Sequence, residues 1–119
     1  MIPLDIRKLL RSFGFAFNGI KLSLKEQNMR IHFTCAIVVI IAGLLTKISL
    51  YEWLALTLII ALVIGMEMVN TAIEHVVDLV SPDYHPLAKI AKDVAAGAVL
   101  VLAIASVVIG MIIFIPKWF

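Results

Sequence analysis

Three long apolar segments, separated by short polar connections, dominate the pattern of the chain. They cover about residues 30–48, 53–79 and 87–116. Each can form a helix long enough to cross the hydrocarbon core of a bilayer, which takes about 20 residues. The pattern therefore predicts an all-α integral membrane protein with three transmembrane helices.

The connections between these segments carry boundary signals. Tyr51 and Trp53 mark a membrane–water interface between the first two helices. Pro82 and Pro86 bound a turn between the second and third helices, because a proline disfavours helix at the residue before it. Past Met66 the apolar spacing continues on one face only, so the second helix should project partly from the bilayer.

Residues 3–25 follow a different pattern. Hydrophobic residues recur there at spacings of three and four, and basic residues are interleaved with them: Arg7, Lys8, Arg11, Lys21 and Lys25. This arrangement is typical of an amphipathic helix that lies on an anionic leaflet, with its basic side chains reaching lipid phosphates. We expect a surface helix over this range.

Composition leaves little room for anything but these helices. The chain has 119 residues, of which 63% are hydrophobic and 15% charged, and its mean hydropathy is +1.11. Residues 1–119 should thus form one membrane domain. Three thin helices cannot enclose a site and also shield every polar side chain from lipid, so we expect a homo-oligomer with sites between subunits. The single cysteine, Cys35, excludes a disulfide within the chain.

Charge suggests an orientation. Six of the ten Lys and Arg residues precede the first span, and Lys89 and Lys92 follow the second, whereas the connection between these spans has only Lys47. By the positive-inside rule, the N-terminus and the turn before the third helix face the cytoplasm. The end of the second helix then lies on the side where ATP is found.

Four polar residues interrupt the apolar surface of the second helix: Glu67, Asn70, Glu74 and Asp78. At 100° per residue they project from one face, within an arc of about 80°. We call this set the polar stripe. A carboxylate at membrane depth costs several kcal/mol unless it is paired, protonated or bound to a cation. A divalent cation shared by carboxylates would offset that cost.

Glu26 is the only acid near the start of the first span, and the inferred orientation places it on the same side as Glu74. These two could face each other across a helix pair and bind one Mg²⁺ through oxygen ligands. Alternatively, the carboxylates of the stripe only neutralise basic residues near the interface, which applies most to Asp78 at the wet end. The candidate partners are Lys89, Lys92 and Arg30.

Other familiar chemistry is missing from the sequence. It contains no G-x-x-x-x-G-K-[ST] loop, no Gly-rich kinase loop and no Ser/His/Asp arrangement, so a nucleotide would bind in a non-standard way. Its histidines are not spaced as a metal-binding cluster, and His32 is expected to be a hydrogen-bonding or packing residue. His85, beside Tyr84 in the turn, is the exception.

The string E-x-x-N-x-x-x-E-x-x-x-D from Glu67 to Asp78, followed by Tyr84-His85 and Lys92-Asp93, closely resembles the signature of the prokaryotic diacylglycerol kinase family. Residues 85–99 look like its Gram-positive branch, whose members are undecaprenol kinases. The resemblance implies a homotrimer in the bacterial cell membrane. Each subunit would have an N-terminal surface helix and three spans, with composite active sites at the cytoplasmic surface.

The resemblance also implies roles for single residues. Glu67 matches the family's catalytic base, and Asn70 a polar active-site residue beside it. Glu26 and Glu74 match magnesium-binding carboxylates that also contact the nucleotide. The remaining positions that match contacts with ATP are Asp83, Tyr84, His85, Lys92 and Asp93, with Lys8 in a looser N-terminal match.

Together these observations predict an ATP- and Mg²⁺-dependent lipid kinase. Glu67 lies about two turns, roughly 10 Å, deeper than Glu74, where the hydroxyl of a lipid alcohol could approach from the bilayer. The resemblance favours undecaprenol as substrate, with diacylglycerol as the alternative. Two non-enzyme readings remain, namely an oligomeric ion or proton pathway lined by carboxylates, and a structural subunit with the stripe as a docking surface.

Overall fold

The computed structural model describes residues 2–119, which form four helices and no strand. The helices are α1 (Ile6–Ser23), α2 (Gln27–Thr46), α3 (Leu50–Val80) and α4 (Pro86–Trp118). α2, α3 and α4 are each long and apolar enough to cross a membrane. The predicted all-α architecture, with one N-terminal helix before three spans, is confirmed.

Local capping sets the connection between α2 and α3. The Ser49 hydroxyl accepts a hydrogen bond from the Glu52 N–H at 3.2 Å, and the Glu52 carboxylate accepts one from the Ser49 N–H at 2.9 Å. This capping box starts α3 at Leu50, earlier than the apolar pattern suggests. Lys47 ends α2 in the left-handed conformation, with φ of 52°, and its N–H donates to the Gly43 carbonyl.

Histidine and proline begin α4. The Nδ1 atom of His85 accepts a hydrogen bond from the Leu87 N–H at 3.1 Å, so His85 caps the helix. Pro86 takes the first helical position, where the N–H that proline lacks would have no partner inside the helix. The connection between α3 and α4 is therefore short and well defined.

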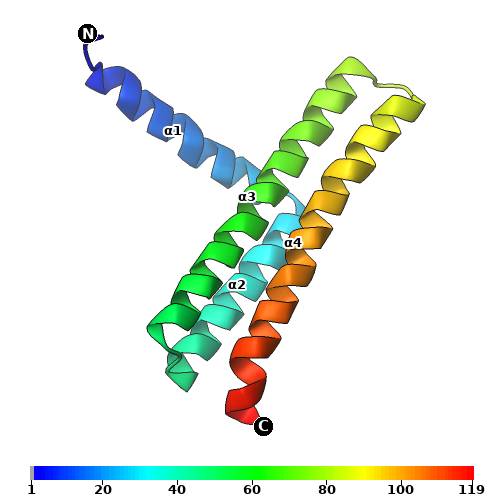
Figure 1. Ribbon diagram of the computed structural model, residues 1–119. Helices are drawn as coiled ribbons and strands as arrows, with labels where there is room; N and C mark the ends of the chain where they lie inside the picture. The colour runs from blue at the N-terminus through cyan, green and yellow to red at the C-terminus, as the bar shows by residue number, and fades with distance from the viewer. Residues whose placement is uncertain (1) are drawn as a thin grey trace.

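The helices pack unequally, as Figure 1 shows. α3 and α4 lie side by side in opposite directions, α2 packs against α3, and α1 leads away from the bundle at a steep angle. A buried apolar cluster joins the bundle near the end where α4 terminates: Ile48, Leu56, Ile113 and Phe114. Gly43 permits a close approach there, because a Cβ atom at this position would lie 2.8 Å from the Trp53 ring.

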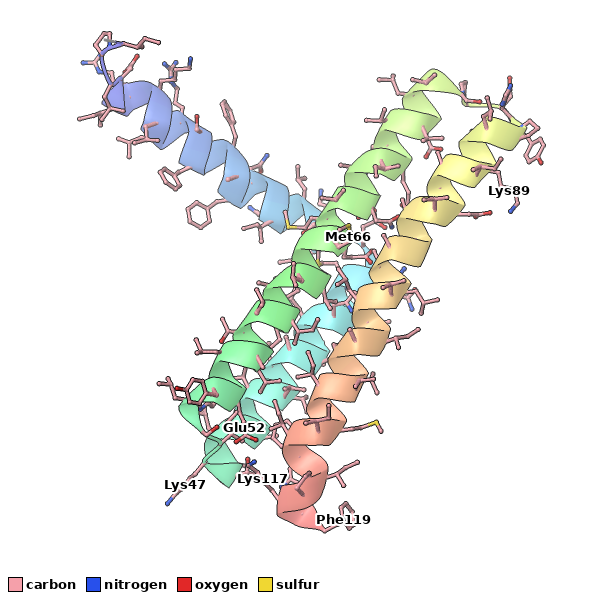
Figure 2. The ribbon with its side chains drawn as sticks, in the orientation of Figure 1. Lys47, Glu52, Met66, Lys89, Lys117 and Phe119 are labelled. Atoms are coloured by element: carbon pink, nitrogen blue, oxygen red, sulfur yellow. The ribbon has the colours of Figure 1, made fainter. Side chains whose placement is uncertain are left out.

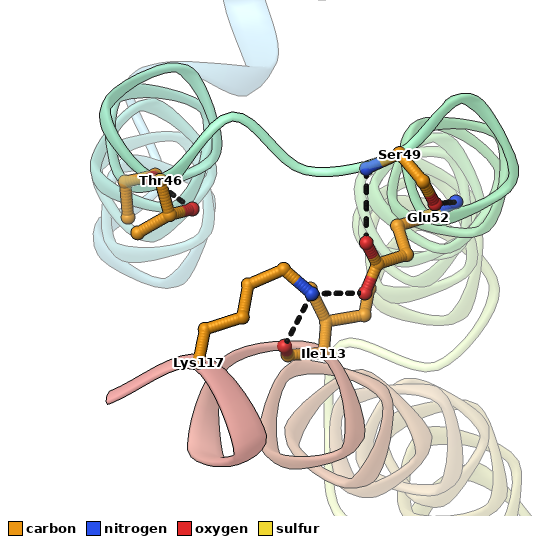
Figure 3. A network of polar contacts seen from close by, with 6 residues as sticks. Thr46, Ser49, Glu52, Ile113 and Lys117 are labelled. Atoms are coloured by element: carbon orange, nitrogen blue, oxygen red, sulfur yellow. Dashed lines mark hydrogen bonds and ion pairs between the residues drawn. The ribbon is translucent and has the colours of Figure 1, made fainter. Parts of the chain in front are cut away.

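An ion pair closes the same end of the bundle. The Lys117 ammonium on α4 lies 2.6 Å from a Glu52 carboxylate oxygen on α3, and it also donates to the Ile113 carbonyl at 3.2 Å (Figure 3). Figure 2 shows this pair at one end of α3 and α4, with Lys89 at the other end, which we call the loop end. The pair makes the start of α3 level with the end of α4.

The lengths of the helices determine which of them reach the loop end. α2 has 20 residues and spans about 30 Å, the thickness of a bilayer core. α3 and α4 have 31 and 33 residues, so they extend about 16–20 Å further. Figure 1 shows both continuing well past the junction of α1 and α2. The loop end of the α3–α4 pair therefore stands beyond the part of the bundle that α2 can span.

Candidate active site

The polar stripe runs along the half of α3 that ends at the loop end. Glu67 and Asn70 are buried, at 4% and 5% exposure. Glu74 is half-buried and Asp78 is exposed. The stripe therefore passes from a buried end beside α2 to a solvent-facing end beside the α3–α4 connection.

Glu67 faces α2. Its Oε2 atom lies 3.6 Å from Nε2 of His32, and it interacts electrostatically with the carboxylates of Glu74 and Glu26. His32 lies in the second turn of α2, so Glu67 lies only about 8 Å along the axis from the start of that helix. Because α1 joins α2 at that start, Glu67 lies near the level of the surface helix rather than at the middle of the spans.

Asn70 links two members of the stripe. Its amide nitrogen donates a hydrogen bond to a Glu74 carboxylate oxygen at 3.2 Å. Its amide oxygen, Oδ1, is buried and has no hydrogen-bond partner among the described residues. Buried polar atoms are nearly always paired, so an orphaned oxygen at this place is available to a ligand.

Glu26 approaches the stripe from α2. It precedes the first turn of α2, is half-buried, and its side chain makes no capping hydrogen bond. Along antiparallel helices, the six residues from Glu26 to His32 cover about 9 Å and the seven from Glu67 to Glu74 about 10 Å. Since His32 is opposite Glu67, Glu26 lies close to the height of Glu74.

The side-chain oxygens near Glu26 and Glu74 suit a magnesium ion as ligands. Within residues 2–119, no three His, Cys, Asp or Glu side chains are arranged to bind a metal by themselves. The groups that do gather are oxygens: the carboxylates of Glu26 and Glu74 and the Asn70 amide oxygen. Mg²⁺ is usually held by one or two carboxylates together with substrate phosphates, rather than by a complete protein cage. The residues present fit that mode of binding.

A second polar site lies at the loop end. A pocket of about 360 Å³ opens between the end of α3, the connection and the start of α4. Its volume falls in the range of about 300–1,000 Å³ that is usual for small-molecule sites. The residues matched to ATP contacts in this part of the chain all line it, together with Asp78: Asp83, Tyr84, His85, Lys92 and Asp93.

Four charged residues of this pocket form two ion pairs. Lys92 Nζ lies 2.5 Å from Asp78 Oδ1, and Lys89 Nζ lies 2.5 Å from Asp93 Oδ2. The contact of Asp78 with Lys92 agrees with the alternative interpretation, in which the outermost carboxylate neutralises a nearby base. Such exposed pairs contribute only about 0–1 kcal/mol, so a phosphate group could replace either acid.

Within one chain, Lys8 lies apart from the other predicted site residues. It is exposed in the first turn of α1, where its N–H donates to the Asp5 side chain at 3.2 Å. From Lys8 to the end of α1 at Ser23 the helix runs about 22 Å. Figure 1 shows that this helix carries its N-terminal half away from α3 and α4.

The sequence-based interpretation gave His32 no part in the site, yet the structure places it against Glu67. A signal was present in the spacing. Glu26 and His32 are six residues apart, and Glu67 and Glu74 are seven apart. If Glu26 faces Glu74 across two antiparallel helices, this spacing places His32 opposite Glu67.

Comparison with known proteins identifies the family of the chain. A family model described as prokaryotic diacylglycerol kinase matches residues 14–114. The chain is 44% identical over 114 residues to a protein named undecaprenol kinase from Bacillus subtilis (strain 168), covering 95% of this chain and 93% of the relative. It is 46% identical over 110 residues to a protein named diacylglycerol kinase from Synechocystis sp., covering 91% of this chain and 63% of the relative. A diacylglycerol kinase from Escherichia coli (strain K12) is 26% identical over 102 residues, covering 85% and 84%.

The family match extends over most of the chain, and the relatives are kinases by name. The predicted family and the predicted enzyme class are both confirmed, in preference to an ion pathway or a structural subunit. A kinase requires a phosphoryl donor, and the relatives named undecaprenol kinase and diacylglycerol kinase are lipid kinases by name. This chain belongs to the prokaryotic diacylglycerol kinase family of membrane lipid kinases.

Proposed function

We propose that this protein transfers the γ-phosphoryl group of ATP to the hydroxyl of a membrane lipid alcohol, at the cytoplasmic face of the bacterial cell membrane. One observation carries the proposal. Glu67 is a buried carboxylate about 8 Å along the axis from the start of α2, beyond which the α3–α4 pair continues alone. A lipid hydroxyl can approach Glu67 from the membrane-spanning part of the bundle, and a nucleotide can approach it from the polar pocket at the loop end.

Glu67 is the proton acceptor in this proposal. Its carboxylate takes the proton of the lipid hydroxyl as the hydroxyl oxygen bonds to the γ-phosphorus, and the bond from that phosphorus to the bridging oxygen of ADP breaks. Asn70 supports the reaction by holding Glu74 through its amide nitrogen. The unpartnered Asn70 oxygen leaves a second acceptor beside the base.

Glu26 and Glu74 are the residues that would hold Mg²⁺. When bound, the ion neutralises charge on the phosphate oxygens and orients them for in-line transfer. The approach of these two carboxylates to Glu67, from different helices, supports the assignment. The repulsion between each of them and the Glu67 carboxylate is the kind that a bound cation relieves.

The nucleotide would occupy the pocket at the loop end. Lys92 is its best-placed cation, and a phosphate would compete with Asp78 for it. His85 uses Nδ1 to cap α4, so Nε2 is the ring nitrogen left to contact a nucleotide. Asp83, Tyr84 and Asp93 line the remaining wall.

We further propose a homotrimer with composite sites. A single chain leaves apolar side chains exposed on every span and carries Lys8 away from the pocket. If α1 of one subunit extends over its neighbour, the basic Lys8 can reach a phosphate or a lipid headgroup there. Lys8 would then act in trans.

The relatives support undecaprenol as the lipid acceptor, with undecaprenyl phosphate as product, because the relative named undecaprenol kinase is similar over nearly its whole length. Diacylglycerol, giving phosphatidic acid, is the second candidate, because other relatives bear that name. The decisive experiment measures turnover on both lipids in the same mixed micelles, at equal mole fractions, with ATP and Mg²⁺. We expect undecaprenol to be favoured by at least about tenfold. Preference for diacylglycerol would reverse the assignment, and no transfer to either lipid would refute the proposed function.

A further inference from the structure

α2 is joined to the rest of the bundle almost entirely by apolar contacts. Its hydroxyl side chains are satisfied inside the helix, since Thr34 donates to the Arg30 carbonyl and Thr46 to the Ala42 carbonyl. In the part of the chain that the structure describes, His32 is the only α2 side chain that pairs with a polar side chain of another helix. Its partner is Glu67.

The surroundings of Glu67 make this contact significant. No Lys or Arg side chain within residues 2–119 forms an ion pair with it, and the charged groups that act on it besides His32 are the acids Glu74 and Glu26. A buried carboxylate needs a hydrogen-bond donor or a positive charge to offset the loss of solvent. The imidazole of His32 is the group that α2 supplies for this purpose, and the Asn70 side chain supplies a hydrogen bond from α3 itself.

The other neighbours of His32 leave its ring without a competing partner. The ring lines a small cavity of about 90 Å³ between α2, α3 and α4, whose walls are mostly apolar. Ser106, a polar residue of that wall, donates its hydroxyl to the Ala103 carbonyl at 2.6 Å. His32 is thus placed between an apolar cavity on one side and the Glu67 carboxylate on the other.

We propose that His32 is a positioning residue for Glu67, which it orients from α2 through Nε2. The proposal rests on the proposed function, since it assumes that Glu67 is the proton acceptor. By holding Oε2, the imidazole leaves Oε1 directed to the lipid hydroxyl. The separation of 3.6 Å between Nε2 and Oε2 is longer than a hydrogen bond. Catalytic contacts are often long in the absence of substrate and tighten only in its complex.

Three substitutions separate this role from packing. His32→Gln places an amide nitrogen near the position of Nε2, His32→Asn places it nearer the position of Nδ1, and His32→Leu removes the donor while keeping an apolar side chain. We expect the Leu and Asn variants to lose about tenfold or more in kcat with little change in KM for ATP. The Gln variant should recover most of that loss. Near-normal kcat in His32→Leu, or equal kcat in the Gln and Asn variants, would overturn the proposal.

A measurement without turnover tests the contact itself. Nitrogen-15 NMR of the histidine rings, in detergent, compares the unmodified protein with Glu67→Gln. The Nε2 resonance of His32 should move, while His75 and His85 serve as internal controls. An unchanged His32 resonance would refute the pairing. If the unmodified protein phosphorylates no lipid alcohol, the proposed function fails on its own account, and the NMR comparison still decides whether His32 contacts Glu67.

Discussion

Lys117, in the last turn of α4, lies 2.6 Å from Glu52, in the first turn of α3, and this contact sets the relative height of the two longest helices. Glu52 is held in place because its other carboxylate oxygen accepts the Ser49 N–H. A second pair, Lys92 with Asp78, joins the same helices at the loop end. The two pairs thus bridge α3 and α4 at opposite ends of the bundle.

The Lys117–Glu52 pair should contribute measurably to stability. Its side chains are only 29% and 25% exposed, so Lys117→Met should lower the thermal stability clearly, because Glu52 loses its charged donor. Thermal inactivation in detergent measures this. Lys89→Met is the matched control, since the Lys89–Asp93 pair is 61% and 63% exposed and should cost less than about 0.5 kcal/mol. Equal losses in both variants would contradict the prediction.

Glu67→Gln should abolish phosphoryl transfer. The substitution removes a proton acceptor without changing the shape of the side chain, and loss of a general base costs about 10²-fold or more in kcat. Nucleotide binding, measured by equilibrium titration, should be nearly unchanged, because the pocket at the loop end does not include Glu67. Near-normal turnover would show that another group accepts the proton.

Asn70→Ala should raise the Mg²⁺ concentration needed for half-maximal turnover. The amide of Asn70 orients Glu74 by a hydrogen bond of 3.2 Å. Loss of such a supporting contact typically weakens metal affinity by about 10–100-fold. Titrating Mg²⁺ at saturating ATP measures the shift. Thr71→Ala is a control on the same turn, because the Thr71 hydroxyl donates only to the Glu67 carbonyl. An unaltered Mg²⁺ requirement in Asn70→Ala would separate Asn70 from the metal.

Substitutions of Asp78 and of Lys92 should have different effects on the kinetics, although the two residues pair with each other. If Asp78 only neutralises Lys92, Asp78→Asn should change turnover by no more than about threefold, as expected for an exposed pair. Lys92→Met should raise KM for ATP by about tenfold or more, because the pocket loses the cation nearest the stripe. Steady-state kinetics with varied ATP distinguish the two. A loss in Asp78→Asn as large as in Lys92→Met would give Asp78 a direct role.

The sequence by itself determined the three spans, the amphipathic N-terminal helix and the arrangement of the polar stripe on one face. These features follow from hydropathy and helical periodicity, which are properties of one segment at a time. The roles proposed for Glu67, Glu26 and Glu74 come from the resemblance of the motif to the family and need no coordinates. The segment that forms the pocket at the loop end was predictable, because its residues lie close together in the chain.

Only the tertiary structure decided which helices meet and at what height. The contacts of His32 with Glu67, of Lys117 with Glu52 and of Asp78 with Lys92 all join different helices. Each depends on the rotation and axial shift of one helix against another, which packing and loop geometry set and no local pattern records. The same geometry brought Glu67 near the level of α1 and left Lys8 apart from the pocket within one chain.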